Sequence, residues 1–148
     1  MKKNNARCAA VLASCLLAAT LARAEDIGRV KVAKGDVSIE RAGARVPAIV
    51  GAGVQTADVV VTGSDGSVGI TMNDDSLLSA GANSRLSLDE YAHDPSTNQG
   101  RFRVSLDRGT LAVVSGRIAK QSPDAMKVRT PSAVLGVRGT EFAVAVGR

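Results

Sequence analysis

The sequence predicts an all-β protein, built either as a compact twisted β-sandwich or as a short β-solenoid made of hairpins. Three observations support this prediction: apolar and polar residues alternate over short segments, turn sequences separate the segments, and glycine is frequent. Period-two alternation is typical of strands that are buried on one face. All 15 glycines lie after residue 24, and an interior glycine costs a helix about 1 kcal/mol relative to alanine. Long helices are therefore not expected.

The N-terminal segment, residues 1–24, has the pattern of a secretory signal peptide. Lys2, Lys3 and Arg7 form a basic head, an uncharged and mostly apolar run follows from residue 8 to 21, and Ala22-Arg23-Ala24 ends the segment. The run is short for a membrane-spanning helix, and the order of basic head, apolar run and A-x-A is that of a cleaved export signal. We therefore expect a mature chain of residues 25–148 without a transmembrane helix, located in the periplasm or secreted.

A minor alternative concerns the stretch Leu12 to Cys15, "LASC". It resembles a bacterial lipobox, in which the cysteine is lipidated and becomes the new N-terminus. In that case the protein would be a lipoprotein anchored through Cys15.

Removal of the signal changes the electrostatics of the chain. Four of the 19 Lys and Arg residues lie before Glu25, and none of the 14 Asp and Glu residues do, which leaves 15 cations against 14 anions and a net charge of +1. Nucleic-acid binding needs a basic stripe on the folded domain, and the three aromatic residues, Tyr91, Phe102 and Phe142, do not form a stacking platform. Nucleic acid is therefore not an expected partner.

The strands are expected in short steps along the mature chain. The alternating or β-branched segments are 28–34, 36–41, 58–62, 67–72, 84–89, 101–107, 111–114 and 126–130, with further strands in 130–146. Turn sequences occupy 63–66 and 73–76, Arg108-Gly109 is a candidate for a tight hairpin, and the polar stretches 92–100 and 120–124 are expected to be exposed.

Residues of the kinds that carry catalysis are few. His93 is the only histidine, it lies in a polar stretch, and we expect it to be a solvated loop residue. Both cysteines, Cys8 and Cys15, are lost with the signal, and no G-x-S-x-G, P-loop or dinucleotide motif is present. The aspartates of the turns, Asp65, Asp74 and Asp75, do not have calcium-loop spacing and are expected to cap their own backbone. We therefore expect a protein that is not an enzyme and has neither a cofactor nor a metal.

From about residue 35 to residue 146 the chain resembles the FecR domain, a periplasmic β-rich module of bacterial regulators and of many exported proteins. The resemblance begins with Gly35-Asp36-Val37 and continues with Gly53, Asp58, Thr62, Gly63, Gly66 and Ile70, then with 74–78, 83–88 and 104–111. It ends in the most specific motif, "VRTPSAVLGVRGTEFAV", Val128 to Val144. The motif residues, structural or partner-binding, are Asp58, Thr62, Gly63, Thr130, Pro131, Gly136, Arg138, Gly139, Thr140 and Phe142.

The closing motif carries several expectations of its own. Thr130-Pro131 should begin a strand near a sheet edge, since proline lacks a ladder N–H, and Gly136 and Gly139 should permit a bulge or corner that packs Phe142 inward. Arg138 would either pair with a carboxylate such as Asp58 or contact a partner.

The chain also departs from the family pattern in two ways. Asp75 replaces the turn glycine that the family has after Asp74, so the turn should have another geometry or place Asp75 in a left-handed conformation. FecR regulators of sigma factors also have a cytoplasmic anti-sigma segment, a transmembrane helix and a further periplasmic region, in place of which this sequence has a cleavable signal. The iron-signalling role of those regulators with TonB-dependent receptors therefore carries over only weakly.

The expected function is that of an exported, non-enzymatic interaction module of the bacterial periplasm or envelope. It would bind another envelope or periplasmic protein through a strand edge or the polar loops. The alternative is a sensor component of a cell-surface signalling or iron-uptake system that acts with a separate membrane regulator. The oligomeric state is left open.

Overall fold

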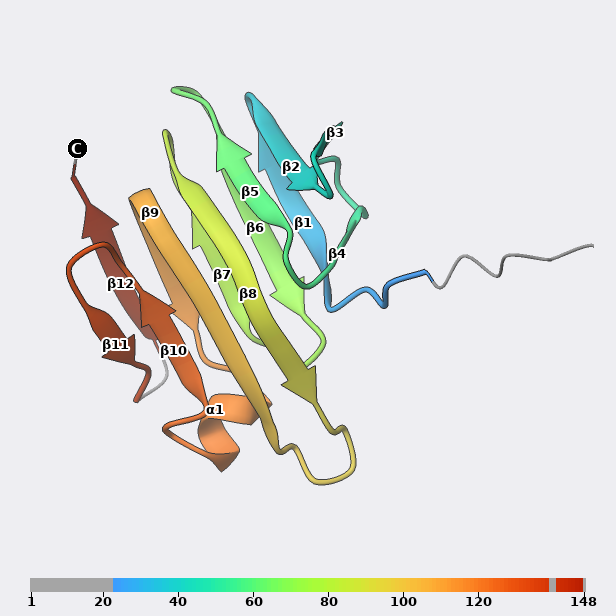
Figure 1. Ribbon diagram of the computed structural model, residues 1–148, viewed down its shortest axis with the longest axis vertical. Coiled ribbons are helices and arrows are strands. Elements are labelled where there is room, and N and C mark those ends of the chain that lie inside the picture. Colours follow the sequence, from blue (N-terminus) through green and yellow to red (C-terminus); the bar gives the residue numbers. More distant parts are fainter. Residues whose placement is uncertain (1–22, 139–140, 148) are drawn as a thin grey trace, which may run out of the picture.

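The strands form one mostly antiparallel sheet that curls over on itself into a half-barrel of hairpins (Figure 1), which confirms the predicted all-β fold. The computed structural model describes residues 23–138 and 141–147. Its elements are β1 Gly28–Lys34, β2 Val37–Arg41, β3 Ala44–Pro47, β4 Gly53–Val54, β5 Val59–Thr62, β6 Ser67–Met72, β7 Leu77–Ala80, β8 Arg85–His93, β9 Gly100–Val114, α1 Arg117–Gln121, β10 Met126–Arg129, β11 Val134–Gly136 and β12 Glu141–Val146.

The curled sheet has two layers that share the long strand β9. The front layer has the order β3-β2-β5-β8-β9-β10-β11, and the back layer has the order β4-β1-β6-β7-β9-β12. The first half of β9 pairs with β8 and β10, whereas its second half pairs with β7 and β12. Apart from the parallel pair of β9 and β10, the strand pairs are antiparallel. β9 therefore joins the two layers at one side of the molecule.

Four corners at one end of the molecule carry the chain from one layer to the other. They lie between β1 and β2, between β5 and β6, between β7 and β8, and within β9 (upper end of Figure 1). Each corner turns one bent strand from the back layer to the front layer or the reverse. The motif turn 63–66 is one of these corners, so the resemblance falls on the part of the fold that bends the sheet.

The core fills the space between the two layers. Alternate residues of the longer strands point inward, as the burial of β6 illustrates, where Val68, Ile70 and Met72 are buried and the residues between them are not. Phe102, Leu106 and Leu88 face them from the front layer and are at most 1% exposed. This alternation is the pattern that predicted the strands.

The predicted hairpin at Arg108-Gly109 is wrong, because β9 runs without interruption from Gly100 to Val114. Gly109 instead has a positive φ of 91° at the point where β9 leaves β8 for the back layer. A Cβ at Gly109 would clash with Oγ of Ser84, so the corner requires glycine. Turn-forming residues therefore marked a bend within a strand.

Some elements were not predicted from the sequence, and the bounds of others differ from those predicted. β3, β4, β7 and α1 were not predicted, and the polar stretch expected as a loop over 92–100 is a loop only from 94 to 99. The second polar stretch, 120–124, begins inside α1. α1 lies at the end opposite the corners (Figure 1), where its Ile118 is fully buried against the core.

A buried polar cluster connects α1 to the turn between β6 and β7. Asp74 is fully buried and accepts hydrogen bonds from the Ser76 N–H (3.2 Å) and hydroxyl (2.8 Å) and from the Ile118 N–H (3.3 Å). The Tyr91 hydroxyl approaches the same carboxylate at 3.4 Å, and burial raises the pKa of the tyrosine. The prediction that Asp74 caps its own turn is confirmed.

The two other turn aspartates, Asp75 and Asp65, behave differently. Asp75 has a positive φ of 65°, which is one of the two geometries predicted for a residue that replaces the family's glycine. Its carboxylate lies 2.6 Å from Arg117 of α1. Asp65 accepts a hydrogen bond from the N–H of Asp36 in the adjacent corner, 3.2 Å away, so it caps a neighbouring turn.

Candidate interaction surface

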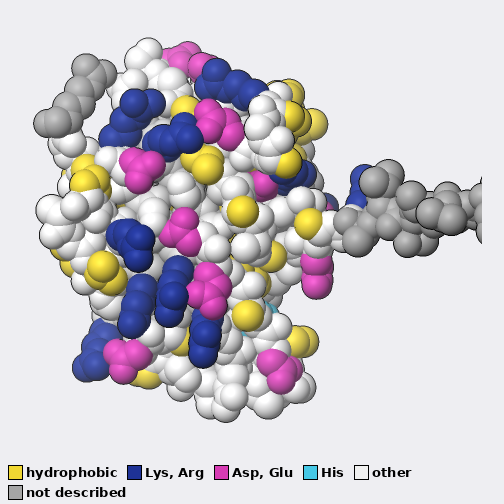
Figure 2. All heavy atoms as spheres, viewed as in Figure 1, with side chains coloured by type: hydrophobic (Ala, Val, Ile, Leu, Met, Phe, Trp, Pro, Cys, Tyr) yellow, Lys and Arg dark blue, Asp and Glu magenta, His cyan; other side chains and the backbone are white. Residues whose placement is uncertain are grey.

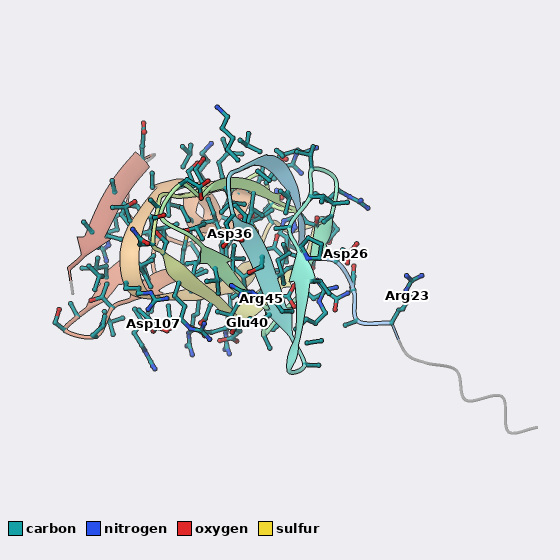
Figure 3. The ribbon with its side chains drawn as sticks, turned by 90° about the horizontal axis from the view of Figure 1, so that it is seen from above. Arg23, Asp26, Asp36, Glu40, Arg45 and Asp107 are labelled. Carbon is teal, nitrogen blue, oxygen red and sulfur yellow. The ribbon has the colours of Figure 1, made fainter. Side chains whose placement is uncertain are left out.

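The motif residues Thr62 and Gly63 hold two corners together. The Thr62 hydroxyl donates a hydrogen bond to the Gly81 carbonyl (2.6 Å) and accepts one from the Ser84 N–H (2.9 Å), and Thr62 is 3% exposed. Gly63 donates its N–H to the carbonyl of Asp36 at 2.8 Å, and Asp36 lies at the first corner (Figure 3). The polar groups of both motif residues therefore make hydrogen bonds within the fold, which is a structural role.

Asp58 is also a structural residue, and its partner differs from the one predicted. Its carboxylate is fully buried and accepts hydrogen bonds from Nε (2.8 Å) and Nη2 (2.6 Å) of Arg41 and from the Gln55 N–H (2.7 Å). Arg41 also donates to the carbonyl of Gly53 at 2.9 Å. The suggested pairing of Asp58 with Arg138 is therefore wrong, and the arginine that joins β2 to the start of β5 is Arg41.

The closing motif begins in a turn. Thr130 and Pro131 follow the end of β10, and the Thr130 hydroxyl accepts a hydrogen bond from the Ala133 N–H at 3.1 Å. These residues connect β10 to β11, so the expectation that they begin a strand is wrong. Gly136 ends β11 without a positive φ, and a Cβ there would meet no atom within 4 Å, so its backbone does not require glycine.

Arg138 lies on the surface after β11. Its Nη2 is 3.2 Å from a carboxylate oxygen of Asp124, and the two side chains are 75% and 81% exposed. Phe142 in β12 is half-buried and packs against the core, in agreement with the expected inward orientation. Gly139 and Thr140 lie outside the described residues.

His93 does not lie in a loop. It is the last residue of β8, opposite Gly100 of β9, and its Nε2 is buried without a hydrogen-bond partner among the described residues. It borders a hollow of about 410 Å³ that is also lined by Tyr91 and Asn73. The expectation of a solvated loop histidine is therefore wrong for both its position and its surroundings.

The outer face of the front layer is densely charged. Figure 2 shows Lys and Arg side chains next to Asp and Glu side chains across this face, and in Figure 3 Glu40, Arg45 and Asp107 lie along one side of the molecule. The Arg85 guanidinium is 2.7 Å from Glu40 and lowers the pKa of that carboxyl. Outward residues of the three central strands are Arg85, Ser87, Asp89, Glu90, Arg101, Arg103, Ser105, Asp107, Lys127 and Arg129.

A groove of about 400 Å³ crosses this face. We call it the β8–β11 groove, and it is lined by Asp89, Glu90, Arg103, Val104, Lys127, Arg129 and Val134. The acidic residues belong to β8, the cations belong to β9 and β10, and Val134 of β11 is 62% exposed at the far side. One side of the groove is therefore acidic, and the other is basic with an apolar border.

The basic side has more charge than the acidic side neutralises. Glu90 lies 3.2 Å from Arg103 and 3.8 Å from Arg101. Lys127 is in direct register with Arg103, and Arg129 lies two residues further along the same face. No carboxylate of residues 23–138 and 141–147 comes within ion-pair distance of Lys127 or Arg129. The groove can therefore accept anionic groups.

Sequence reasoning missed the residues of this groove. The alternation in 126–130 placed Lys127 and Arg129 on one face, which was an available signal. Their position next to Arg103 depends on the parallel pairing of β10 with β9, across the intervening segment from Ser115 to Ala125. Nothing in the local pattern specified that pairing.

Within residues 23–138 and 141–147, no group of three or more His, Cys, Asp or Glu side chains is placed to hold a metal ion. No helix in the described part of the chain is long and apolar enough to cross a membrane.

Comparison with known proteins gives one match. A family model described as FecR protein matches residues 58–148. No curated protein and no solved structure matches. The match begins at the buried Asp58 and includes the corners after β5, the β8–β11 groove and the closing motif.

Proposed function

The chain belongs to the FecR protein family, and from this premise we propose that it is a regulatory interaction module of the bacterial envelope that binds an acidic segment of another protein in the β8–β11 groove. The family is the premise for a regulatory role. The groove supplies the residues that would contact the partner. In this proposal the chain binds a protein partner and is not an enzyme.

The observation that carries the proposal is the pair of uncompensated cations on β10. Lys127 faces Arg103 across the strand pair, and Arg129 follows on the same face. Arg103 is paired with Glu90 at 3.2 Å, whereas no carboxylate of the described residues comes within ion-pair distance of Lys127 or Arg129. Carboxylates of a partner would pair with these two cations and fix the register of the complex.

The shape of the groove indicates the kind of segment that would fit. An extended chain lying along β10 would place alternate side chains toward Lys127 and Arg129, which are two residues apart. Val134, exposed beyond them, would contact an apolar residue of the same segment. We therefore expect a partner segment with acidic residues at alternate positions and an apolar residue beside them.

Site-specific crosslinking tests the groove. A photoreactive residue at Val134 should give an adduct with an envelope protein in intact cells, whereas the same residue at Ala44, exposed on the opposite edge strand β3, should not. The Lys127→Glu/Arg129→Glu double variant should remove the adduct and weaken binding about tenfold or more, since two attractions become repulsions. The identity of the partner would separate an interaction module from a sensor that acts with a membrane regulator.

A matched control makes the same change of charge elsewhere. The Lys31→Glu/Lys120→Glu variant alters two exposed lysines outside the groove and should leave the Val134 adduct unchanged. An adduct that survives Lys127→Glu/Arg129→Glu, or one that appears at Ala44 and not at Val134, would refute the proposed site.

The export part of the proposal has a separate test. Mass spectrometry of protein recovered from fractionated cells should give an N-terminus at Glu25 in the periplasmic or secreted fraction. An N-terminus at a lipidated Cys15 would instead support the anchored form. A full-length chain in the cytoplasm would overturn export and leave the groove hypothesis intact.

The non-enzymatic part rests on the scarcity of catalytic side chains. His93 is the only histidine of the sequence, and its Nε2 has no hydrogen-bond partner among the described residues. Saturable turnover of a substrate by the purified protein, lost in His93→Ala with the fold retained, would refute this part.

A further inference from the structure

The outer face of the back layer carries few charges, and these lie at its borders. We call the outward side of β1, β6, β7, the second half of β9 and β12 the back face. Its central row consists of Gly69, Ser79, Ala112 and Ala143, which are neighbours in register from β6 to β12. Beside this row, Leu77 and Val114 face each other and are 42% and 38% exposed. Small and apolar side chains therefore form the middle of a broad sheet surface.

In a sheet with one solvated face, the strands normally alternate apolar residues that point inward with polar or charged residues that point outward. The front layer follows this rule, since its outward residues are predominantly Lys, Arg, Asp and Glu. On the back face, β6, β7, the second half of β9 and β12 have one charged outward residue, Glu141 at one edge, and the other charges, Arg29, Lys31 and Lys34, are on β1 at the opposite side. An exposed apolar surface with a polar border is typical of a protein contact.

The back face is also hollowed. A shallow depression of about 250 Å³ lies over β7, β9 and β12, and the small residues Ser79, Ala112, Ala143 and Ala145 line it. Leu77 and Val114 stand beside the depression as larger side chains. Side chains of another sheet could therefore pack into this depression.

Two opposite charges at the two borders of the back face, Arg29 and Glu141, lie in one row, whereas Lys31 and Lys34 lie further along β1. Arg29 of β1 is in register with Thr71, which is in register with Leu77, then with Val114, and finally with Glu141 of β12. With strands about 4.8 Å apart, Arg29 and Glu141 are roughly 19 Å apart across the face, with Leu77 midway. A two-fold axis parallel to β7 would place Arg29 of each copy over Glu141 of the other.

We propose that the back face is the contact between two copies of this chain, stacked sheet on sheet about a two-fold axis that runs along β7. The charge pattern selects a second copy, because the face is complementary to itself in this orientation and the same patch serves both subunits. Stacked sheets lie about 10 Å apart. At that separation an arginine side chain reaches a glutamate on the opposing sheet.

The size of the face sets the expected strength. Five strands of about 4.8 Å spacing and six residues of about 3.3 Å rise cover roughly 24 by 20 Å, or about 480 Å² per copy in projection. Two such faces together approach the threshold of about 1000 Å² for a specific interface and fall short of the standard size of about 1600 Å². We therefore expect a dimer that forms and dissociates with concentration.

Charge reversal tests this orientation. Sedimentation velocity over a concentration series should show a monomer–dimer equilibrium for the mature chain. Arg29→Glu alone and Glu141→Arg alone should each weaken the dimer about tenfold or more, because each places like charges together at both ends of the interface. The Arg29→Glu/Glu141→Arg double variant restores opposite charges and should return the dissociation constant toward that of the original chain.

Two further variants complete the test. Leu77→Asp should abolish the dimer, since it buries a carboxylate at the centre of the contact, while circular dichroism reports whether the fold is retained. Arg45→Glu, a charge reversal on the front layer outside the groove, should leave the dimer unchanged. A chain that stays monomeric at the highest concentration, a dimer that persists in Leu77→Asp, or a double reversal that fails to restore association would each overturn the proposal.

Discussion

Removal of the Asp58 carboxylate should destabilise the domain far more than removal of an exposed carboxylate. Asp58 is fully buried and accepts three hydrogen bonds, from Nε and Nη2 of Arg41 at 2.8 and 2.6 Å and from the Gln55 N–H at 2.7 Å. Loss of one member of a buried ion pair costs about 3–5 kcal/mol. Because the Arg41 side chain is 34% exposed and can recover some hydration, we expect Asp58→Ala to cost about 3 kcal/mol. Asp58→Asn, which keeps one acceptor, should cost about 2 kcal/mol.

Urea denaturation followed by circular dichroism measures this cost, since a domain of this size should unfold in a two-state transition. The corresponding fall in melting temperature is about 10 °C. The matched control is Glu40→Ala, which removes the partner of Arg85 from a pair that is also short, 2.7 Å, but more than one-third exposed on both sides. That change should move the urea midpoint only slightly, because water screens an exposed pair. Equal losses for Asp58→Ala and Glu40→Ala would refute the assignment of Asp58 as a buried structural anchor.

Three further changes test other parts of the fold. Thr62→Val keeps the shape of the side chain but leaves the partly buried Gly81 carbonyl and the buried Ser84 N–H without their hydroxyl partner, so it should cost about 2 kcal/mol in urea denaturation. Thr71→Val on the outer face should change stability by less than about 0.5 kcal/mol. Gly109→Ala should lower the free energy of unfolding by about 2–4 kcal/mol, because φ is +91° and the new Cβ would clash with Ser84. Gly136→Ala should be neutral or slightly stabilising. Equal effects of the two substitutions would contradict the described corner. Burial raises the pKa of Tyr91 above that of an unfolded tyrosine. The stability that Tyr91 contributes should therefore be complete below about pH 10 and decline as the pH rises further. Tyrosinate absorbance reports the titration of this single tyrosine directly, and Tyr91→Phe should reduce the decline in stability.

Local sequence patterns predicted the strands well where one strand occupies one layer. β1 and β6 have the predicted bounds, because alternation along each of them reports burial on a single face. The same pattern wrongly predicted a hairpin at Arg108-Gly109 in β9, because the chain bends at Gly109 and the strand continues in the other layer. Turn residues predict a change of direction, and they do not distinguish a hairpin from a corner.

The candidate site was less predictable than the fold, because it depends on contacts between distant segments. Arg41 was available as a partner for Asp58, but the choice between Arg41 and Arg138 depends on β2 lying beside β5. The basic side of the β8–β11 groove likewise depends on the parallel pairing of Lys127 with Arg103. Alternation places a side chain on a face, and tertiary pairing decides which charges share that face.

Three motif residues with buried polar contacts, Asp58, Thr62 and Gly63, lie apart from the two candidate surfaces, and this separation has a consequence for function. Thr62, Gly63 and Asp58 use their polar groups at corners and in a buried pair, and so they can specify the bent sheet without contacting a partner. Outward residues such as Lys127 and Ala112 do not hold the core together, so they are free to differ without loss of the fold. These three motif residues therefore specify the architecture, while the partner should be determined by the two outer faces, one charged and one mostly apolar.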